Sequence, residues 1–229
     1  MQHLAVIPDG NRRWASQNKM ASFFGHQKGL DVIKTAFQFC LKNGIKYFSL
    51  YAFSLENFRR DEAEKRYLFE QILAKAFTQQ LPELIKHNIR VRFVGDRTLF
   101  PPSVREAIEQ IEEQTRSFEA LKVNILFCYG ATAEITNAVK RIAALVRGGA
   151  IQLEDIDESM VRSALWTEDT PTPDLIIRTG GAVRLSNFML YQAAYSEFMF
   201  LDDYWPAITE DHLQRCLEKF NTIKRNFGS

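Results

Sequence analysis

The chain has 229 residues, of which 46% are hydrophobic and 25% are charged. This length is typical of one α/β domain, and the apolar content is too high for a disordered chain. The 29 basic and 28 acidic residues nearly cancel, which argues against a nucleic-acid binder that relies on a broad basic face.

Apolar segments of strand length alternate along the chain with amphipathic helical segments. In chain order, we expect a strand at residues 3–7, a helix at 28–42, a strand at 47–53, a helix from 61 to 87, a strand at 90–94, a helix at 103–119, a strand at 121–127, a helix at 133–146, strands at 174–177 and 198–201, and a helix at 210–224. Pro82 is expected to kink or interrupt the second helix. The alternation predicts a single α/β domain over residues 1–229, in which helices cover both faces of an open, mostly parallel sheet.

Polar residues closely follow five of the predicted strands. They are Asp9, Ser54, Asp96, Tyr129 and Arg178. Because the carboxyl ends of parallel strands meet at one edge of a sheet, we expect these side chains to gather where open α/β folds bind their ligands.

The segment after the first strand has the composition of an anion site. Residues 9–14 read DGNRRW, and Asp9 is an oxygen ligand of the kind that Mg²⁺ prefers. Gly10 allows close approach of the backbone to a ligand, while Arg12 and Arg13 with the neighbouring amides suit a diphosphate. Taken alone, the same residues also fit an ordinary helix start with Asp9 as the N-cap and the arginines in solvent.

Two later segments carry similar signals. Residues 178–187 read RTGGAVRLSN, in which Arg178 and Arg184, a hydroxyl and flexible glycines suit phosphate oxygens. Residues 53–60 read FSLENFRR and place polar groups after an apolar strand. Each segment alone also fits a plain turn or loop. The absence of a Walker A loop and of the dinucleotide glycine pattern disfavours a nucleotide-binding enzyme.

The chain resembles the cis-prenyltransferases, also called the undecaprenyl diphosphate synthase family, over essentially its whole length. The collinear motifs are DGNRRWA at 9–15, Gly25-His26, YAFSLEN at 51–57, and IRTGGAVRLSNF at 177–188 followed by Trp205-Pro206. The resemblance implies an enzyme that joins isopentenyl diphosphate to an allylic diphosphate, with Mg²⁺ as cofactor and a homodimer as the assembly.

The resemblance also implies roles for residues around the allylic diphosphate. It assigns Asp9 to Mg²⁺ and the diphosphates, as the residue essential for the reaction. The positions that assist at the reacting centre are His26, Ser54 and Asn57. Those that hold the allylic diphosphate or shape its surroundings are Gly10, Asn11, Arg13, Trp14 and Glu64.

A second group of positions is implied to hold isopentenyl diphosphate. These positions are Arg60, Arg178, Arg184 and Ser186. Glu197 matches a Mg²⁺-linked acid near the subunit interface. With Asp9, it completes the expected metal-ligand set.

Several positions depart from the family pattern. Ser22 and Thr132 stand where an arginine is usual, and each lost charged hydrogen bond should weaken diphosphate binding by about 1–3 kcal/mol. The other departures are Pro8, Asp61, Ala131, Ala182 and Asn226. Because the matching Asp, Asn, His, Arg and Ser residues remain, we expect a catalytic chain.

An apolar tunnel between helices and sheet is expected to hold the prenyl tail. Its candidate lining is Tyr67, Leu68, Ile72, Leu73, Phe77, Leu121, Ile125 and Phe127, although each of these also fits ordinary core packing. The small Ala52 leaves room for a long tail, which favours a polyprenyl, undecaprenyl-like product. The family resemblance implies farnesyl diphosphate as the allylic starter. Two alternatives stay open: a divergent enzyme that makes short or irregular prenyl diphosphates, and a non-catalytic partner subunit.

The cellular context follows from what the sequence lacks. Cys40, Cys128 and Cys216 have no metal-site or disulfide spacing, so we expect reduced, buried thiols. The sequence MQHLAVIPDG has no signal-peptide pattern, and no apolar run approaches the ~20 residues of a membrane span. We therefore expect a cytoplasmic protein, with peripheral membrane association through its product.

Overall fold

The computed structural model describes residues 1–59, 62, 65, 69 and 75–224. Within these residues, six parallel strands form one sheet in the order β3-β4-β2-β1-β5-β6. The strands are β1 His3–Ile7, β2 Tyr47–Ser54, β3 Ile89–Val94, β4 Leu121–Tyr129, β5 Leu175–Arg178 and β6 Glu197–Phe200. Each expected strand is present within two residues of its expected bounds, which confirms the predicted α/β fold.

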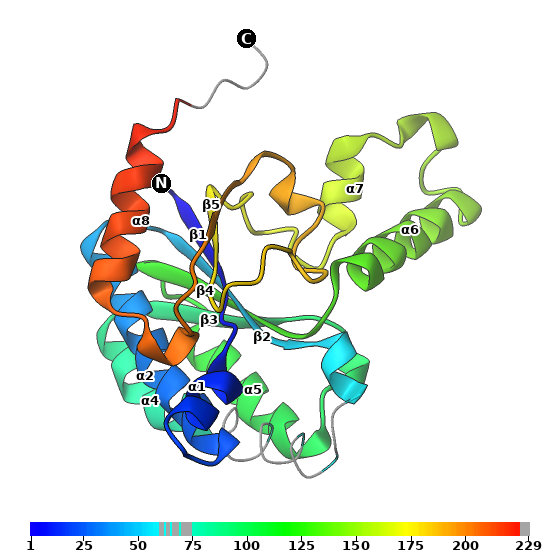
Figure 1. Ribbon diagram of the computed structural model, residues 1–229. Helices are drawn as coiled ribbons and strands as arrows, with labels where there is room; N and C mark the ends of the chain where they lie inside the picture. Colours follow the sequence, from blue (N-terminus) through cyan, green and yellow to red (C-terminus); the bar gives the residue numbers. More distant parts are fainter. Residues whose placement is uncertain (60–61, 63–64, 66–68, 70–74, 225–229) are drawn as a thin grey trace.

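Helices cover both faces of the sheet (Figure 1). One layer contains α2 Ser22–Lys42, α4 Lys75–Lys86, α5 Pro102–Thr115 and α8 Glu210–Thr222. The opposite layer contains α6 Ala131–Arg147 and α7 Glu158–Ala164, while the short α1 Asn11–Gln17 joins β1 to α2.

Alternation along β1 shows how the sheet builds two cores. Leu4 and Val6 pack in the cluster on the α2 and α5 side, whereas Ala5 and Ile7 belong to the cluster on the other face. All four are buried because both faces of the central strand are covered, as expected for a parallel sheet.

Helices α2, α4 and α7 differ most from the sequence prediction, and the short α1 was not among the expected helices either. Helix α2 begins six residues earlier than expected, because its early glycines pack closely on neighbouring segments instead of ending the helix. Pro82 lies inside α4 and does not interrupt it; the proline forfeits one backbone hydrogen bond, while buried Leu84 anchors the helix on the core. Helix α7 was not predicted, although its N-cap Asp157 accepts a hydrogen bond from the Met160 amide.

Two further expectations can be compared with the structure. All three cysteines are free and buried, and burial raises the pKa of Cys128 to about 12. No helix within the described residues is long and apolar enough to cross a membrane.

The strand order marks the place of the site. From β1 the chain passes to β2 on one side, whereas from β5 it passes to β6 on the other. The carboxyl ends of β1 and β5 therefore flank a topological switch point, where open α/β sheets bind ligands. Asp9 follows β1 and Arg178 ends β5 at this point.

Candidate functional site

Asp9 is held between two arginines. Arg178 Nη2 donates to Asp9 Oδ2 at 2.9 Å, and Arg13 Nη2 donates to Asp9 Oδ1 at 3.0 Å. The backbone of Asp9 is fixed by Thr179, whose Oγ1 accepts from the Asp9 amide and donates to its carbonyl. The buried carboxyl ends of β1 and β5 thus hold one carboxylate and one guanidinium in register.

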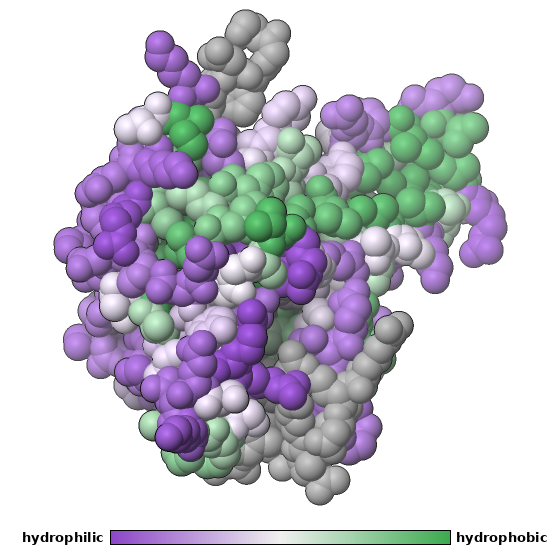
Figure 2. All heavy atoms as spheres, viewed as in Figure 1, coloured by the Kyte–Doolittle hydropathy of each residue, from purple (hydrophilic) through white to green (hydrophobic). Residues whose placement is uncertain are grey.

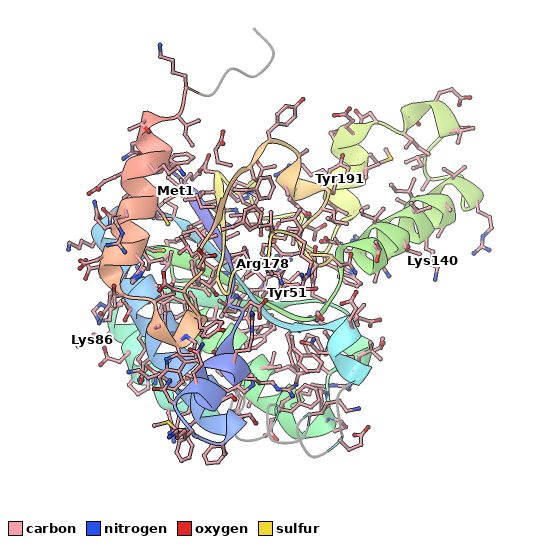
Figure 3. All side chains as sticks on the ribbon, in the orientation of Figure 1. Met1, Tyr51, Lys86, Lys140, Arg178 and Tyr191 are labelled. Carbon is pink, nitrogen blue, oxygen red and sulfur yellow. The ribbon has the colours of Figure 1, made fainter. Side chains whose placement is uncertain are left out.

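Arg178 connects this carboxylate to the glycine-rich loop after β5. Its Nη1 donates to Ser186 Oγ at 2.7 Å and to the Arg184 carbonyl at 2.6 Å, while Arg184 Nε donates to the same hydroxyl at 3.2 Å. The Arg178 side chain is only 5% exposed, and its Nε has no hydrogen-bond partner among the described residues. Figure 3 shows Arg178 near Tyr51 at the centre of the molecule. A buried guanidinium with a spare donor is suited to an incoming anion.

The charges shift the protonation of Asp9. Burial alone would raise the pKa of this carboxyl, but hydrogen bonding to Arg178 and the charge of Arg13 lower the pKa below its ordinary value. Asp9 is therefore a carboxylate at neutral pH, as a metal ligand must be.

Close backbone contacts position Asn11. Trp205 Nε1 donates to the Gly29 carbonyl at 3.0 Å, and a Cβ on Gly29 would lie 2.6 Å from Asn11 Oδ1. Asn11 Nδ2 donates to the Pro8 carbonyl, whereas Asn11 Oδ1 is buried and accepts from no described residue. An unused, buried acceptor oxygen therefore lies against Gly29 of α2.

The main cavity, of about 610 Å³, opens at this end of the sheet. Predicted site residues that line it are Asp9, Asn11, His26, Ser54, Asn57, Arg178 and Ser186. Asn57 Oδ1 accepts from the Ser54 amide at 3.3 Å, which folds the turn after β2 towards the cavity. The structure thus brings seven of the predicted site residues together around one cavity.

A second cavity, of about 600 Å³, adjoins the first along the 9–13 segment. Its lining includes Gly10, Arg12 and Arg13, and it shares Asp9 and Asn11 with the main cavity. Ser22, where the family usually has arginine, also lines it. This cavity has the basic composition expected for a diphosphate subsite, with one cation fewer.

Glu197 and Trp14 are predicted site residues that lie away from both cavities. Glu197 pairs with Leu175 at the start of β5, so that it lies about 10 Å along the strands from Arg178 and the Asp9 end of the sheet. Trp14 is half-buried in α1 and is absent from the lining of both cavities. Arg60 is outside the described residues, as is Glu64.

An apolar extension leads away from the polar groups. The main cavity is lined by Leu30, Ile33, Leu50 and Ile125, and a cavity of about 430 Å³ between α2 and α4 shares Leu30 and Ile33 with it. We call the latter the α2–α4 cavity. The two shared side chains form a wall between the apolar part of the main cavity and the α2–α4 cavity, whose lining is mixed and also includes Gln27, Lys34 and Glu83.

The expected tunnel lining is only partly correct. Ile125 lines the main cavity, but Leu121 and Phe127 are fully buried in the core. Phe127 of β4 packs against the rings of Phe53 and Phe100, so its side chain is enclosed by other aromatic residues and is not part of the lining of the main cavity. The remaining candidates lie outside the part of the chain that the structure describes: Tyr67, Leu68, Ile72, Leu73 and the side chain of Phe77.

Sequence reasoning missed several residues that shape the site. Thr179 fixes the Asp9 backbone, Tyr204 stacks under the Arg13 guanidinium at 4.9 Å, and Asn187 and Glu56 line the main cavity. Thr179, Asn187 and Glu56 lie inside the motifs quoted above, and that position is the feature of the sequence that could have identified them as site residues. Tyr204 directly precedes the quoted Trp205-Pro206 pair.

The arrangement suits two anionic groups and one divalent cation. Arg178 lines the main cavity and Arg13 the second one, while Arg184 donates to Ser186 of the main cavity, and the spare Arg178 Nε can donate to a phosphate oxygen. The Asp9 carboxylate and the unpaired Asn11 oxygen are the hard oxygen donors that Mg²⁺ prefers. No cluster of three acidic, His or Cys residues that would enclose a metal is found among the described residues. A cation bound here would share its coordination sphere with ligand phosphates.

Known proteins resemble this chain over nearly its whole length. The family model described as "Putative undecaprenyl diphosphate synthase" matches residues 7–228. An isoprenyl transferase of Bacillus subtilis is 40% identical over 227 residues, which cover 99% of this chain and 87% of that protein. A tritrans,polycis-undecaprenyl-diphosphate synthase (geranylgeranyl-diphosphate specific) of Pyrococcus horikoshii is 39% identical, covering 99% of this chain and 86% of that protein. The crystal structure of lavandulyl diphosphate synthase from Lavandula x intermedia, in complex with dimethylallyl diphosphate, has a TM-score of 0.96 at 31% identity, over 100% of this chain and 98% of that chain.

Proposed function

The chain belongs to the undecaprenyl diphosphate synthase family of cis-prenyltransferases, and we propose that it condenses isopentenyl diphosphate with an allylic diphosphate to give a polyprenyl diphosphate. The main support for this proposal is the hydrogen-bond network of Asp9, Arg178 and Ser186, which lies between two polar cavities and beside an apolar extension. Two cationic subsites with one apolar exit match two diphosphates with one growing tail.

The two subsites divide between the two substrates. The cavity that contains Gly10, Arg12 and Arg13 takes the allylic diphosphate, while Arg178 with the 184–186 loop takes isopentenyl diphosphate. Holding both in register reduces a bimolecular reaction to one between neighbouring groups, which contributes much of the rate.

Mg²⁺ is the proposed cofactor. Asp9 would hold it, with Asn11 as the adjacent oxygen donor, and when bound it neutralises charge on the leaving diphosphate. Glu197, at the other end of β5 and β6, would contribute near a subunit boundary rather than beside Asp9 in the same chain.

The side chains of the site support a condensation in which the allylic diphosphate group leaves and a carbon–carbon bond forms. The bond between the allylic carbon and its diphosphate oxygen breaks, and the electron pair leaves with the diphosphate, which arginine donors stabilise in a fixed geometry. The isopentenyl double bond supplies the electrons for the new carbon–carbon bond, and one proton is lost from the isopentenyl unit to form the cis double bond. His26, Ser54 and Asn57 line the cavity where these atoms meet.

The tail follows the apolar extension between α2 and the sheet. Ala52 lines the main cavity, so its small side chain leaves space there, and the α2–α4 cavity continues beyond Ile33. We therefore propose a long, undecaprenyl-like product made from farnesyl diphosphate for lipid-carrier synthesis. The Pyrococcus relative is named as specific for geranylgeranyl diphosphate, so the allylic starter has to be tested separately from the length of the product.

A homodimer is the proposed assembly. The edge strand β6 exposes Phe198 and Phe200, which stack at 6.3 Å, and Tyr195 and Val183 nearby are more than 70% exposed. Figure 2 shows an apolar band across the face on which this part of the chain lies. An unpaired edge strand with exposed apolar rings is better covered by a second copy than by water.

A short or irregular product is the second candidate. It is favoured by the superposition on lavandulyl diphosphate synthase, a structure holding dimethylallyl diphosphate, and by the missing cations at Ser22 and Thr132.

Product analysis separates these candidates. Purified protein is incubated with isopentenyl diphosphate, Mg²⁺ and, separately, dimethylallyl, geranyl, farnesyl or geranylgeranyl diphosphate, with Asp9→Ala as control. A long product ladder that the control lacks supports the polyprenyl function. A short or branched product establishes the alternative, and no turnover with any starter refutes both.

A further inference from the structure

Asn187 uses every polar atom of its side chain to join three segments around the main cavity. Its Oδ1 accepts from the Thr132 amide at 2.9 Å, and its Nδ2 donates to Glu56 Oε1 at 2.9 Å and to Thr132 Oγ1 at 3.1 Å. Its backbone carbonyl accepts from the Ala131 amide at 2.8 Å. One residue therefore ties the loop after β5 to the turn after β2 and to the first turn of α6.

The backbone is shaped for this contact. Ser186 and Asn187 both have left-handed conformations, with φ of 51° and 64°, and asparagine is among the side chains that tolerate this region. A Cβ on Gly130 would lie 2.8 Å from Asn187 Nδ2, so the glycine at the end of β4 makes room for the amide.

The hydrogen bonds fix the direction of the amide. The backbone N–H of Thr132 can only donate, which places Oδ1 towards α6, and the Glu56 carboxylate then faces Nδ2. A reversed amide would put two donors together at Thr132 and two acceptors together at Glu56. The pairing is therefore specific for an amide opposite a carboxylate.

Ser186, the neighbour of Asn187, contacts both arginines of the isopentenyl diphosphate subsite. Its Oγ accepts from Arg178 and Arg184, and its carbonyl accepts from the Tyr51 hydroxyl at 3.3 Å. A shift of Asn187 would move this hydroxyl and both guanidinium groups with it.

We propose that Asn187 is a positioning residue for the second diphosphate subsite, acting through Ser186 on Arg178 and Arg184. The inference rests on the proposed function, because that function assigns isopentenyl diphosphate to this subsite. In this chain Thr132 stands where the family resemblance leads us to expect arginine, and its backbone amide and hydroxyl anchor Asn187. The first turn of α6 then contributes to the subsite by holding the loop, without a cation of its own at position 132.

The test is an exchange of partners between Glu56 and Asn187. Asn187→Asp places two carboxylates face to face, and we expect KM for isopentenyl diphosphate to rise by about tenfold or more, with KM for the allylic diphosphate changed by less than about twofold. The double variant Glu56→Gln with Asn187→Asp restores a carboxylate opposite an amide, and its KM should return to within about threefold of wild type.

Asn187→Ala removes the side-chain contacts, and Asn124→Ala is the matched control. Asn124 also belongs to a buried network, through Ser49 and Thr170, but it lies towards the other end of β4. The control should lower thermal stability without separating the two KM values. A double variant as impaired as Asn187→Asp, or equal changes in both KM values, would overturn the proposal.

Binding of inorganic diphosphate with Mg²⁺, measured by calorimetry on the same variants, keeps the two hypotheses distinct. If wild type turns over no starter, the proposed function fails, yet weaker diphosphate binding in Asn187→Asp that the double variant restores still supports the positioning role. Unchanged diphosphate binding in every variant refutes it.

Discussion

Replacing Arg178 with methionine tests the centre of the site. The change removes the guanidinium from a position that is 5% exposed, together with its bonds to Asp9, Ser186 and the Arg184 carbonyl. Because Asp9 keeps Arg13 and remains 29% exposed, the loss of stability should be near that of one charged hydrogen bond, about 1.5–3 kcal/mol. A comparable loss in binding the isopentenyl diphosphate transition state would lower kcat/KM by roughly 10- to 150-fold.

The assay varies isopentenyl diphosphate at a saturating concentration of the allylic substrate, and chemical denaturation gives the free energy of unfolding. Arg97→Met is the matched control, because Arg97 donates to Glu112 at 2.6 Å on the surface near β3. Arg178→Lys should recover only part of the activity, since one ammonium cannot bridge Asp9 and the 184–186 loop in the same fork. If Arg178→Met and the control have the same kcat/KM, the assignment of Arg178 to this subsite is wrong.

Three further changes probe other parts of the molecule. Burial lowers the pKa of His3 from 6.5 to about 4, so the unfolded chain is protonated at a higher pH than the folded protein. The free energy of unfolding should therefore fall by about 3 kcal/mol as the pH is lowered from 6.5 to 4. In denaturation experiments across this pH range, His3→Gln should lack this dependence. Ile33→Phe puts a larger side chain between the main and α2–α4 cavities, so it should narrow the space for the prenyl tail and shorten the products. An unchanged distribution of product lengths in chromatography would show that the tail lies elsewhere. The double change Phe198→Ser and Phe200→Ser should shift the protein from dimer to monomer in sedimentation velocity; a wild-type monomer would contradict the proposed interface.

The strand ends were predictable because their signals are local. The buried segments that lead to Asp9 and Arg178 are short, apolar and followed by glycine, so their bounds and their common edge followed from the alternation of elements alone. The start of α2 was not predictable in this way. Gly25 reads as a break in a helix, and only the fold shows that it lies against the Asn11 carbonyl, where a Cβ would come within 2.0 Å.

The partners of polar side chains were the least accessible part of the site. The sequence placed Arg178 in an anion-binding loop, but the contact with Asp9 joins residues 169 positions apart. Phe127 shows the opposite failure, because its apolar character fits a tunnel wall as well as the aromatic core in which it packs. Hydrophobic pattern fixes which face of a strand is buried, whereas it does not distinguish contact with a ligand from contact with another ring.

Glycine accounts for why the site is formed before any substrate binds. A Cβ on Gly180 would lie 2.7 Å from Arg13 Nη2, and one on Gly29 would lie 2.6 Å from Asn11 Oδ1, so both polar groups are held against bare backbone. The unpaired Asn11 oxygen is thereby fixed in place, while the spare Arg178 Nε is held by the hydrogen bonds of its terminal nitrogens to Asp9 and Ser186. Because the surrounding chain already holds them, a cation and a diphosphate can satisfy them without reordering side chains. Donors and acceptors that need no reorganisation are the condition under which electrostatic stabilisation of a leaving group is strongest.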